Sequence, residues 1–120
     1  MTPSLGRVII YTKKIEAMVD FYCRYFGYEA VRREGDRIVE LRPKNSGIPL
    51  LLHLASKGQK EGQSLVKLVF DVSDVEAFCD LAKDRGLEFG KIHQADGYCF
   101  ANAKDPSKNS VSVSNRAFRP

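Results

Sequence analysis

The sequence has no apolar run near the roughly 18 residues that a membrane-spanning helix needs. Its longest apolar stretch, residues 48–55, is interrupted by Pro49 and His53. The first residues, MTPSLGR, also lack the charged start and apolar stretch of a secretory signal peptide. We therefore expect a cytoplasmic protein that does not associate with membranes.

Cysteine is scarce, and no C-x-x-C pair occurs. The three cysteines are Cys23, Cys79 and Cys99. An odd count without close pairs indicates free thiols in a reducing compartment. A catalytic cysteine stays open as an alternative, although nothing in the sequence marks a paired base.

Long basic runs with interleaved aromatic residues are also missing. The net charge of +4 and the pI near 9.0 could suggest a nucleic-acid partner. However, the basic residues are mixed with acids, as in RREGDRIVELR. This pattern is typical of a solvated surface of mixed charge, and we predict no nucleic-acid partner.

What the chain does contain is one pattern repeated twice. Its 120 residues and 43% hydrophobic content predict one domain with a buried core. The stretch KIEAMVDFYCRYFGYE (14–29) is matched by DVEAFCDLAKDRGLEF (74–89). Both have helical spacing of apolar residues and a terminating glycine, Gly27 or Gly86. At the two helix starts, the helix dipole favours Asp74 but disfavours Lys14.

The elements around these helices also repeat. We predict strands at 6–12, 28–33, 37–42 and 49–55 around a helix at 15–26, with a hairpin turn at Gly35-Asp36. The second set has strands at 65–72, 87–94, 98–103 and 110–115 and a helix that starts at a Ser73–Glu76 capping box. Residues 56–64 contain no large apolar side chain and predict a linker. The chain thus reads as one domain, 1–120, with modules 6–55 and 65–115 of order βαβββ.

This doubled module resembles the vicinal oxygen chelate superfamily, which includes glyoxalase I, bleomycin resistance proteins and extradiol dioxygenases. The matching pieces are Phe21-Tyr22, Phe26-Gly27-Tyr28 and the loop Asp105-Pro106-Ser107-Lys108-Asn109. The resemblance implies an α+β fold in which two βαβββ modules form a cupped, barrel-like sheet with helices outside. It also implies a ligand in the concave groove and a homodimer. In the family's enzymes, a divalent metal is held by a His on the first strand of each module and a Glu, or a similar ligand, on the last.

In this sequence, those four positions are poorly suited to a metal. The resemblance places Arg7 and Lys67 where the enzymes carry His, Ser112 where they carry Glu, and His53 in the remaining position. A divalent site needs carboxylates, neutral imidazoles or thiolates. Arginine and lysine are protonated at neutral pH and would repel the ion. We therefore predict no bound metal and no cofactor.

Strand alternation indicates which side chains face away from the helices. Arg7 and Tyr11 share one face of the first strand, and Lys67 lies on the corresponding face of its copy. Arg7 and Lys67 would need either an anionic ligand or an internal partner such as Glu40 or Asp71.

Other candidates keep more than one interpretation. His53 is a satisfied core histidine, a ligand contact or an acid/base group. The aromatic residues Tyr11, Tyr98 and Phe100 either stack on a ligand or pack across strands.

The sequence therefore favours a metal-free protein that binds a small anionic or oxygen-rich organic molecule. The predicted ligand contacts are Arg7, Tyr11, His53, Lys67 and Ser112, and no catalytic residue is assigned. The alternative is a metal-dependent lyase, isomerase or dioxygenase with non-standard ligands. Its candidate ligands are Glu40, His53, Asp71 and His93.

Overall fold

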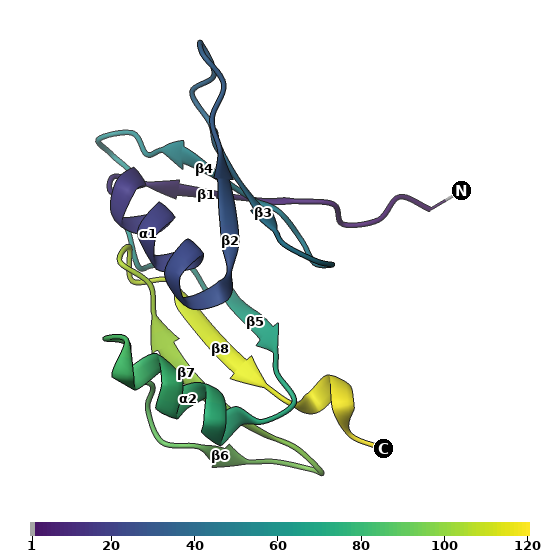
Figure 1. Cartoon of the computed structure of the whole chain (residues 1–120). Coiled ribbons are helices and arrows are strands. Elements are labelled where there is room, and N and C mark those ends of the chain that lie inside the picture. Colours follow the sequence, from purple (N-terminus) through teal and green to yellow (C-terminus); the bar gives the residue numbers. More distant parts are fainter. Residues whose placement is uncertain (1) are drawn as a thin grey trace. The chain divides into compact units, whose positions relative to one another are not determined.

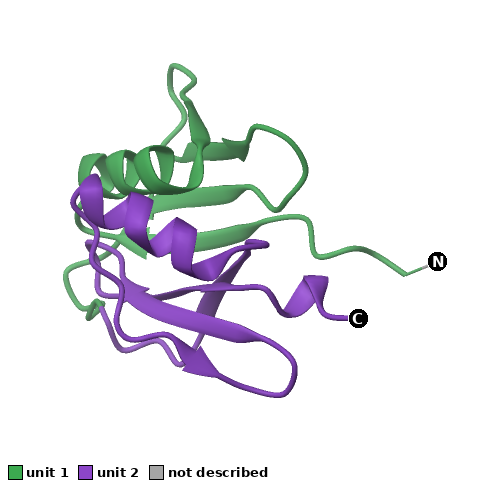
Figure 2. Cartoon of the chain, turned by 60° about the horizontal axis from the view of Figure 1, so that its bottom comes forward, with its two compact units in different colours: residues 1–61 green, residues 62–120 purple. Residues whose placement is uncertain are grey.

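The computed structural model describes residues 2–120, which divide into two compact units between Glu61 and Gly62. Figure 2 shows the first unit in green and the second in purple. The boundary between Glu61 and Gly62 falls inside the predicted linker, 56–64. Among the described residues, no helix is both long and apolar enough to cross a membrane.

The first unit is a four-stranded mixed sheet with one helix (Figure 1). Its elements are β1 (Val8–Thr12), α1 (Ile15–Phe26), β2 (Tyr28–Val31), β3 (Val39–Pro43) and β4 (Leu50–Leu54). The strand order is β1-β4-β3-β2, with β1 parallel to β4 and the other pairs antiparallel.

The second unit repeats this topology. Its elements are β5 (Lys67–Asp71), α2 (Val75–Asp84), β6 (His93–Gln94), β7 (Cys99–Lys104), β8 (Ser110–Ser114) and a short 3-10 helix, η1 (Arg116–Phe118). The strand order is β5-β8-β7-β6, again with only the first pair parallel. The predicted α+β fold class and the duplicated βαβββ module are therefore confirmed.

Helix α1 has the predicted bounds because its sequence carries both an apolar stripe and a stop signal. Met18 and Tyr22 are fully buried, and Phe21 is 6% exposed. Gly27 ends the helix in the left-handed conformation, at φ 69°, and its N–H donates to the carbonyl of Tyr22. A side chain with a Cβ disfavours this conformation, so glycine suits the position.

Helix α2 begins with a different cap from the predicted one. The cap is Asp74, whose Oδ1 accepts from the N–H of Ala77 at 3.0 Å. The predicted Ser73–Glu76 capping box was wrong by one residue. Aspartate at this position both binds an unpaired N–H and complements the positive end of the helix dipole.

Several predicted strands are longer than the observed ones. Residues 65 and 66 lie outside β5, because its partner β8 begins only at Ser110, opposite Lys67. Residues 87–92 are not a strand, since the N–H of Leu87 is engaged by the carbonyl of Ala82 at the end of α2. The first hairpin turn is centred on residues 34 and 35, where the N–H of Asp36 donates to the carbonyl of Arg33.

The Asp105–Asn109 loop is organised around one buried carboxylate. Asp105 is 4% exposed and accepts from the N–H groups of Ser107 and Asn109, each at 2.9 Å. Its second oxygen accepts from Nδ2 of Asn109 at 2.9 Å. These bonds explain why Asp and Asn occur four residues apart before β8.

Candidate functional site

Each sheet has one face that packs on its helix and one that does not, which we call the open face. In the first unit, the helix-side residues Leu41, Leu50 and Leu52 are buried. Strand pairing places the open-face residues in rows: Ile9 lies beside Leu51, and Tyr11 lies beside His53. The sequence assigned these side chains to this face correctly.

The Tyr11–His53 pair is the best-defined feature of the first open face. The ring centroids lie 5.2 Å apart, with 50° between the ring planes. Nδ1 of His53 lies 2.9 Å from the carbonyl oxygen of Leu54. Because a carbonyl only accepts, Nδ1 carries the proton in this hydrogen bond, which leaves Nε2 of the neutral ring as an acceptor. His53 is thus a half-buried surface residue with one free ring nitrogen, rather than a core histidine.

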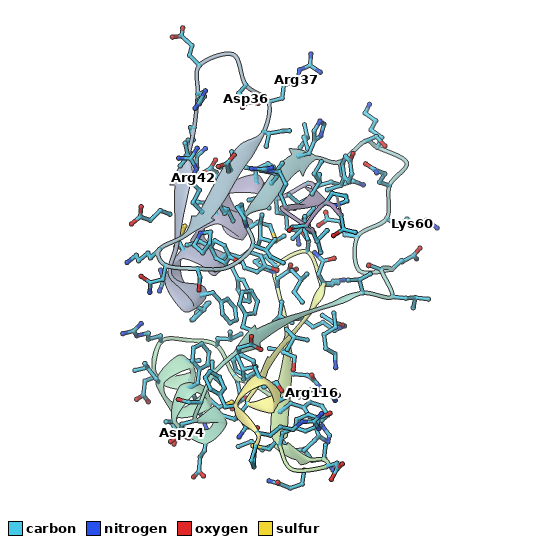
Figure 3. All side chains as sticks on the ribbon, turned by 90° about the vertical axis from the view of Figure 1, so that its right-hand side faces the viewer. Asp36, Arg37, Arg42, Lys60, Asp74 and Arg116 are labelled. Atoms are coloured by element: carbon cyan, nitrogen blue, oxygen red, sulfur yellow. The ribbon has the colours of Figure 1, made fainter. Side chains whose placement is uncertain are left out.

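Arg7 precedes β1 and is exposed. Within residues 2–120, no carboxylate pairs with its guanidinium. Glu40, which the sequence offered as a partner, binds Arg42 instead. The hydrogen bond and charge of Arg42 lower the pKa of Glu40, with a smaller contribution from Arg7. Arg42 is labelled in Figure 3, on β3.

The open face of the second sheet is richer in polar and aromatic side chains. Pairing of β5, β8, β7 and β6 brings four sets of alternating residues to this face. They are Lys67, Val69 and Asp71 on β5, Ser110, Ser112 and Ser114 on β8, Phe100, Asn102 and Lys104 on β7, and His93 on β6.

Lys67 is tethered across this face. Its Nζ donates to Oδ1 of Asn102 at 3.0 Å and lies 5.5 Å from the ring centroid of Phe100. The predicted internal partner Asp71 forms no ion pair with it, and no other described carboxylate does. The ammonium is therefore positioned by a neutral amide and a ring, with its charge uncompensated.

Ser112 lies on the same face but is only 2% exposed. Its Oγ donates to the carbonyl of Ala101 at 3.0 Å. The hydroxyl proton is therefore used within the sheet, and the lone pairs of the oxygen are what a ligand or neighbouring group could reach.

Several residues on this face were not among the predicted site residues. Asn102 holds Lys67, and His93 stacks on Phe100 at 5.1 Å with an interplanar angle of 23°. The sequence considered Phe100 and Tyr98 as stacking candidates and named His93 only as an alternative metal ligand. A polar residue in the middle of the strand 98–103, as Asn102 is, was the signal that could have identified the partner of Lys67.

The donor set does not fit the metal that enzymes of the resembled superfamily hold. Of the four positions, Arg7 and Lys67 are cations, Ser112 uses its proton within the sheet, and only His53 offers a nitrogen donor. Throughout residues 2–120, no group of three or more His, Cys, Asp and Glu side chains is arranged to hold a metal ion. Of the alternative ligands, Glu40 is engaged by Arg42, and His93 is stacked on Phe100.

The cysteines are free and half-buried. Burial raises the pKa of the Cys23 and Cys79 thiols above the usual value. A raised pKa reduces the thiolate fraction at neutral pH, and the thiolate is the nucleophile. The structure therefore disfavours these two residues as catalytic nucleophiles.

Comparison with known proteins extends the resemblance over nearly the whole chain. The sequence model described as Glyoxalase/Bleomycin resistance protein/Dioxygenase superfamily matches residues 4–113. A search of curated proteins found no significant match.

Solved structures share the fold at low sequence identity. TnmS3, described as an antibiotic binding protein from Streptomyces sp. CB03234, is 20% identical, with a TM-score of 0.77 over 94% of this chain and 96% of its own. A glyoxalase/bleomycin resistance protein from the same organism is 20% identical, with a TM-score of 0.71 over 92% and 98%. A lactoylglutathione lyase from Agrobacterium tumefaciens is also 20% identical, with a TM-score of 0.71 over 98% and 97%.

Proposed function

Because this chain belongs to the glyoxalase/bleomycin resistance protein/dioxygenase superfamily, we propose that it is a metal-free protein that binds a small anionic or oxygen-rich organic ligand. The family contains both metal enzymes and binding proteins, so membership alone does not decide between them. The charge and hydrogen bonding of the open sheet faces favour binding.

The observation that carries the proposal is the position of Lys67. Its ammonium is fixed by Asn102 and Phe100, and no carboxylate of the described residues neutralises it. A cation fixed in this way supplies a preorganised charge for an anionic group and loses little side-chain entropy on binding. A divalent cation would be repelled at the same place.

The other proposed contacts supply complementary chemistry. On the first open face, Arg7 offers a guanidinium fork, Tyr11 a partly exposed ring and His53 an accepting Nε2. On the second open face, Ser112 offers the lone pairs of its Oγ. Each face thus offers a cation and an acceptor, which suit an organic acid that also carries hydroxyl groups.

The description of TnmS3, which has this fold, as an antibiotic binding protein supports small-molecule binding as the function of this chain. We extend the proposal to the assembly: modules 6–55 and 65–115, with linker 56–64, form one ligand-binding domain that works as a homodimer in the cytoplasm. Sedimentation velocity at micromolar concentration tests the homodimer, which a purely monomeric species would contradict.

A thermal-shift screen of acidic metabolites and cationic drugs, followed by calorimetry on the hits, tests the function. We expect acids to stabilise the protein and Lys67→Gln to weaken their binding at least about tenfold, as expected for loss of one charge-assisted hydrogen bond. Lys91→Gln, which removes an exposed lysine of the same unit, should leave affinity unchanged. Stabilisation by cationic drugs alone would reject the anion preference.

Metal analysis of the purified, dialysed protein tests the metal-free part separately. Near-stoichiometric zinc, nickel, iron or manganese would reject it. The same preparation should show no glyoxalase activity when divalent metals are added.

A further inference from the structure

Two arginines near the C-terminus gather around one aromatic ring. The guanidinium carbon of Arg116 lies 5.1 Å from the ring centroid of Tyr98, and that of Arg119 lies 5.5 Å from it. Both arginines are exposed, and Tyr98 is half-buried. Arg116 is labelled in Figure 3, on η1.

The backbone around this cluster is fixed by hydrogen bonds to the sheet. Oγ of Ser114 accepts from the N–H of Arg116 at 3.1 Å, and Oδ1 of Asn115 accepts from the N–H of Cys99 at 2.8 Å. The turn of η1 closes with the N–H of Phe118 donating to the carbonyl of Asn115. The arginines thus project from a short helix that is tied to β7 and β8.

Each guanidinium has one anchoring hydrogen bond. Nη1 of Arg116 donates to the hydroxyl of Tyr98 at 3.2 Å, and Nη1 of Arg119 donates to the carbonyl of Asp96 at 3.1 Å. A guanidinium has five N–H donors, so most of each fork stays available. These hydrogen bonds orient the two guanidinium groups without neutralising their charge.

The cluster forms no ion pair with a carboxylate of the described residues. Within residues 2–120, neither Arg116 nor Arg119 pairs with a carboxylate, whereas Arg24, Arg32 and Arg42 all do. Two like charges beside one ring repel each other, and the cation–π attraction of each is modest at an exposed site. A carboxylate or phosphate that accepts from both forks would remove this repulsion.

The ring beneath the arginines continues into the open face of the second sheet. Tyr98 lies 6.2 Å from Phe100, and Phe100 is stacked on His93 at 5.1 Å. At the other side, Lys67 lies over Phe100. Cations therefore adjoin the aromatic row at two places, Arg116 and Arg119 at Tyr98 and Lys67 at Phe100.

We infer that Tyr98, Arg116 and Arg119 form a subsite for the acidic group of an aromatic acid, whose ring lies against Phe100 and His93. This inference rests on the proposed function and narrows the ligand class from organic anions to aromatic carboxylates or aromatic phosphates. Offset or edge-to-face contact between the ligand's ring and the aromatic row supplies affinity, and the two guanidinium groups select the ligand's acidic group.

Four small probes separate the contributions of ring and charge. Benzoate and phenyl phosphate carry both, acetate carries only the acid, and benzyl alcohol carries only the ring. We expect benzoate or phenyl phosphate to bind saturably in a heteronuclear NMR titration, with shifts centred on residues 98–102 and 114–119. Acetate and benzyl alcohol should each bind at least about tenfold more weakly. The tighter of the two aromatic acids identifies the acidic group.

The double variant Arg116→Gln/Arg119→Gln removes the forks and keeps the hydrogen-bonding capacity. We expect it to weaken binding of the aromatic acid at least about tenfold while its thermal midpoint stays close to that of the original protein. Arg33→Gln/Arg37→Gln removes the same charge from the exposed hairpin of the first unit and is the matched control. The control should bind like the original protein.

The outcomes separate this inference from the proposed function. Binding that Lys67→Gln weakens but Arg116→Gln/Arg119→Gln does not would overturn the subsite and leave the anion-binding function standing. Benzyl alcohol binding as well as benzoate would also overturn it. Failure of every acid, in the probe set and in the metabolite screen alike, would reject both.

Discussion

The two units have the same strand order and pairing, but they use their aromatic residues differently. In the first unit, the rings of Phe21, Tyr22 and Tyr28 cluster around α1 and β2 and are buried. In the second unit, the row of His93, Phe100 and Tyr98 lies on or beside the open face and is only half-buried.

The charged side chains of the two open faces also differ. On the first open face, Glu40 and Arg42 neutralise each other, and Arg7 is the cation without a carboxylate among the described residues. On the second, Lys67, Arg116 and Arg119 stay without a carboxylate among the described residues. The first copy thus keeps a cluster of its rings in the core and has Tyr11, His53 and Arg7 on or beside its open face, whereas the second places a longer row of rings and more cations on or beside its own. This contrast directs attention to the second open face as the main binding surface.

The largest effect should come from testing the buried middle of strand β4 against its exposed end. Leu52→Ala removes a fully buried side chain of β4, and we expect a loss of about 2–5 kcal/mol in the free energy of unfolding. Leu54→Ala, on the same strand, removes a side chain that is 61% exposed and should change it by less than about 0.5 kcal/mol. Urea unfolding of both variants checks this, and equal losses would contradict the difference in burial between the two positions.

The Asp105 loop is a feature of the second unit, and its loss should have the next largest effect. Asp105→Ala leaves three N–H donors without their acceptor. Hydrogen bonds to a charged group contribute about 1.5–3 kcal/mol each and are not additive, so we expect a loss of about 2–4 kcal/mol.

Asp84→Ala serves as the control for this loop, because Asp84 is an exposed aspartate at the end of α2. Its unfolding midpoint in urea should stay near that of the original protein. A similar drop in both variants would mean that Asp105 acts through charge alone.

The helix starts provide a smaller contrast. Asp74 caps α2 through its side chain, whereas Lys14 at the start of α1 forms no such bond. Asp74→Ala should cost about 1 kcal/mol, and Lys14→Asp should stabilise by roughly 0.5 kcal/mol, since it removes a cation from the positive end of the dipole. Chemical denaturation of both single variants measures the two changes, and changes of the same sign would contradict the capping argument.

The smallest effect concerns the exposed Glu16–Arg32 ion pair of the first unit, in which Nη2 of Arg32 lies 2.8 Å from Oε1 of Glu16. The hydrogen bond from Arg32 lowers the pKa of Glu16 below its usual value of 4.5. The pair's stabilisation is therefore present above about pH 4.5 and is lost as pH falls through the folded-state pKa.

Arg32→Gln tests this ion pair. We expect its stability to fall below that of the original protein at pH 7 and to converge with it in acid, with a smaller gap in high salt. Arg37→Gln, in the same hairpin, should show no such pH dependence. A gap that stays constant down to the most acidic pH at which both proteins fold would contradict the assignment.

Much of the fold could be predicted because it depends on local patterns. Helix α1 was predicted with its observed bounds, since the helical spacing of its apolar residues and the terminating Gly27 are both local signals. Strand ends were less predictable, because a residue such as Val66 forms a strand only where a partner strand runs beside it. For the site, alternation assigned Tyr11, His53 and Lys67 to the open faces. It could not show that Asn102, 35 residues away, would hold Lys67.

The sequence by itself determined the duplicated module, its two helices and the faces of the first and last strands of each module, because these follow from periodicity and turn chemistry. Tertiary structure alone decided the pairing of long charged side chains: Glu40 with Arg42, Lys67 with Asn102, and Arg116 and Arg119 with Tyr98. Lysine and arginine side chains can reach several neighbours. The register of the strands and the position of the C-terminal helix decide which neighbour each side chain reaches. The neighbour in turn decides whether the cation is neutralised or stays available for a ligand.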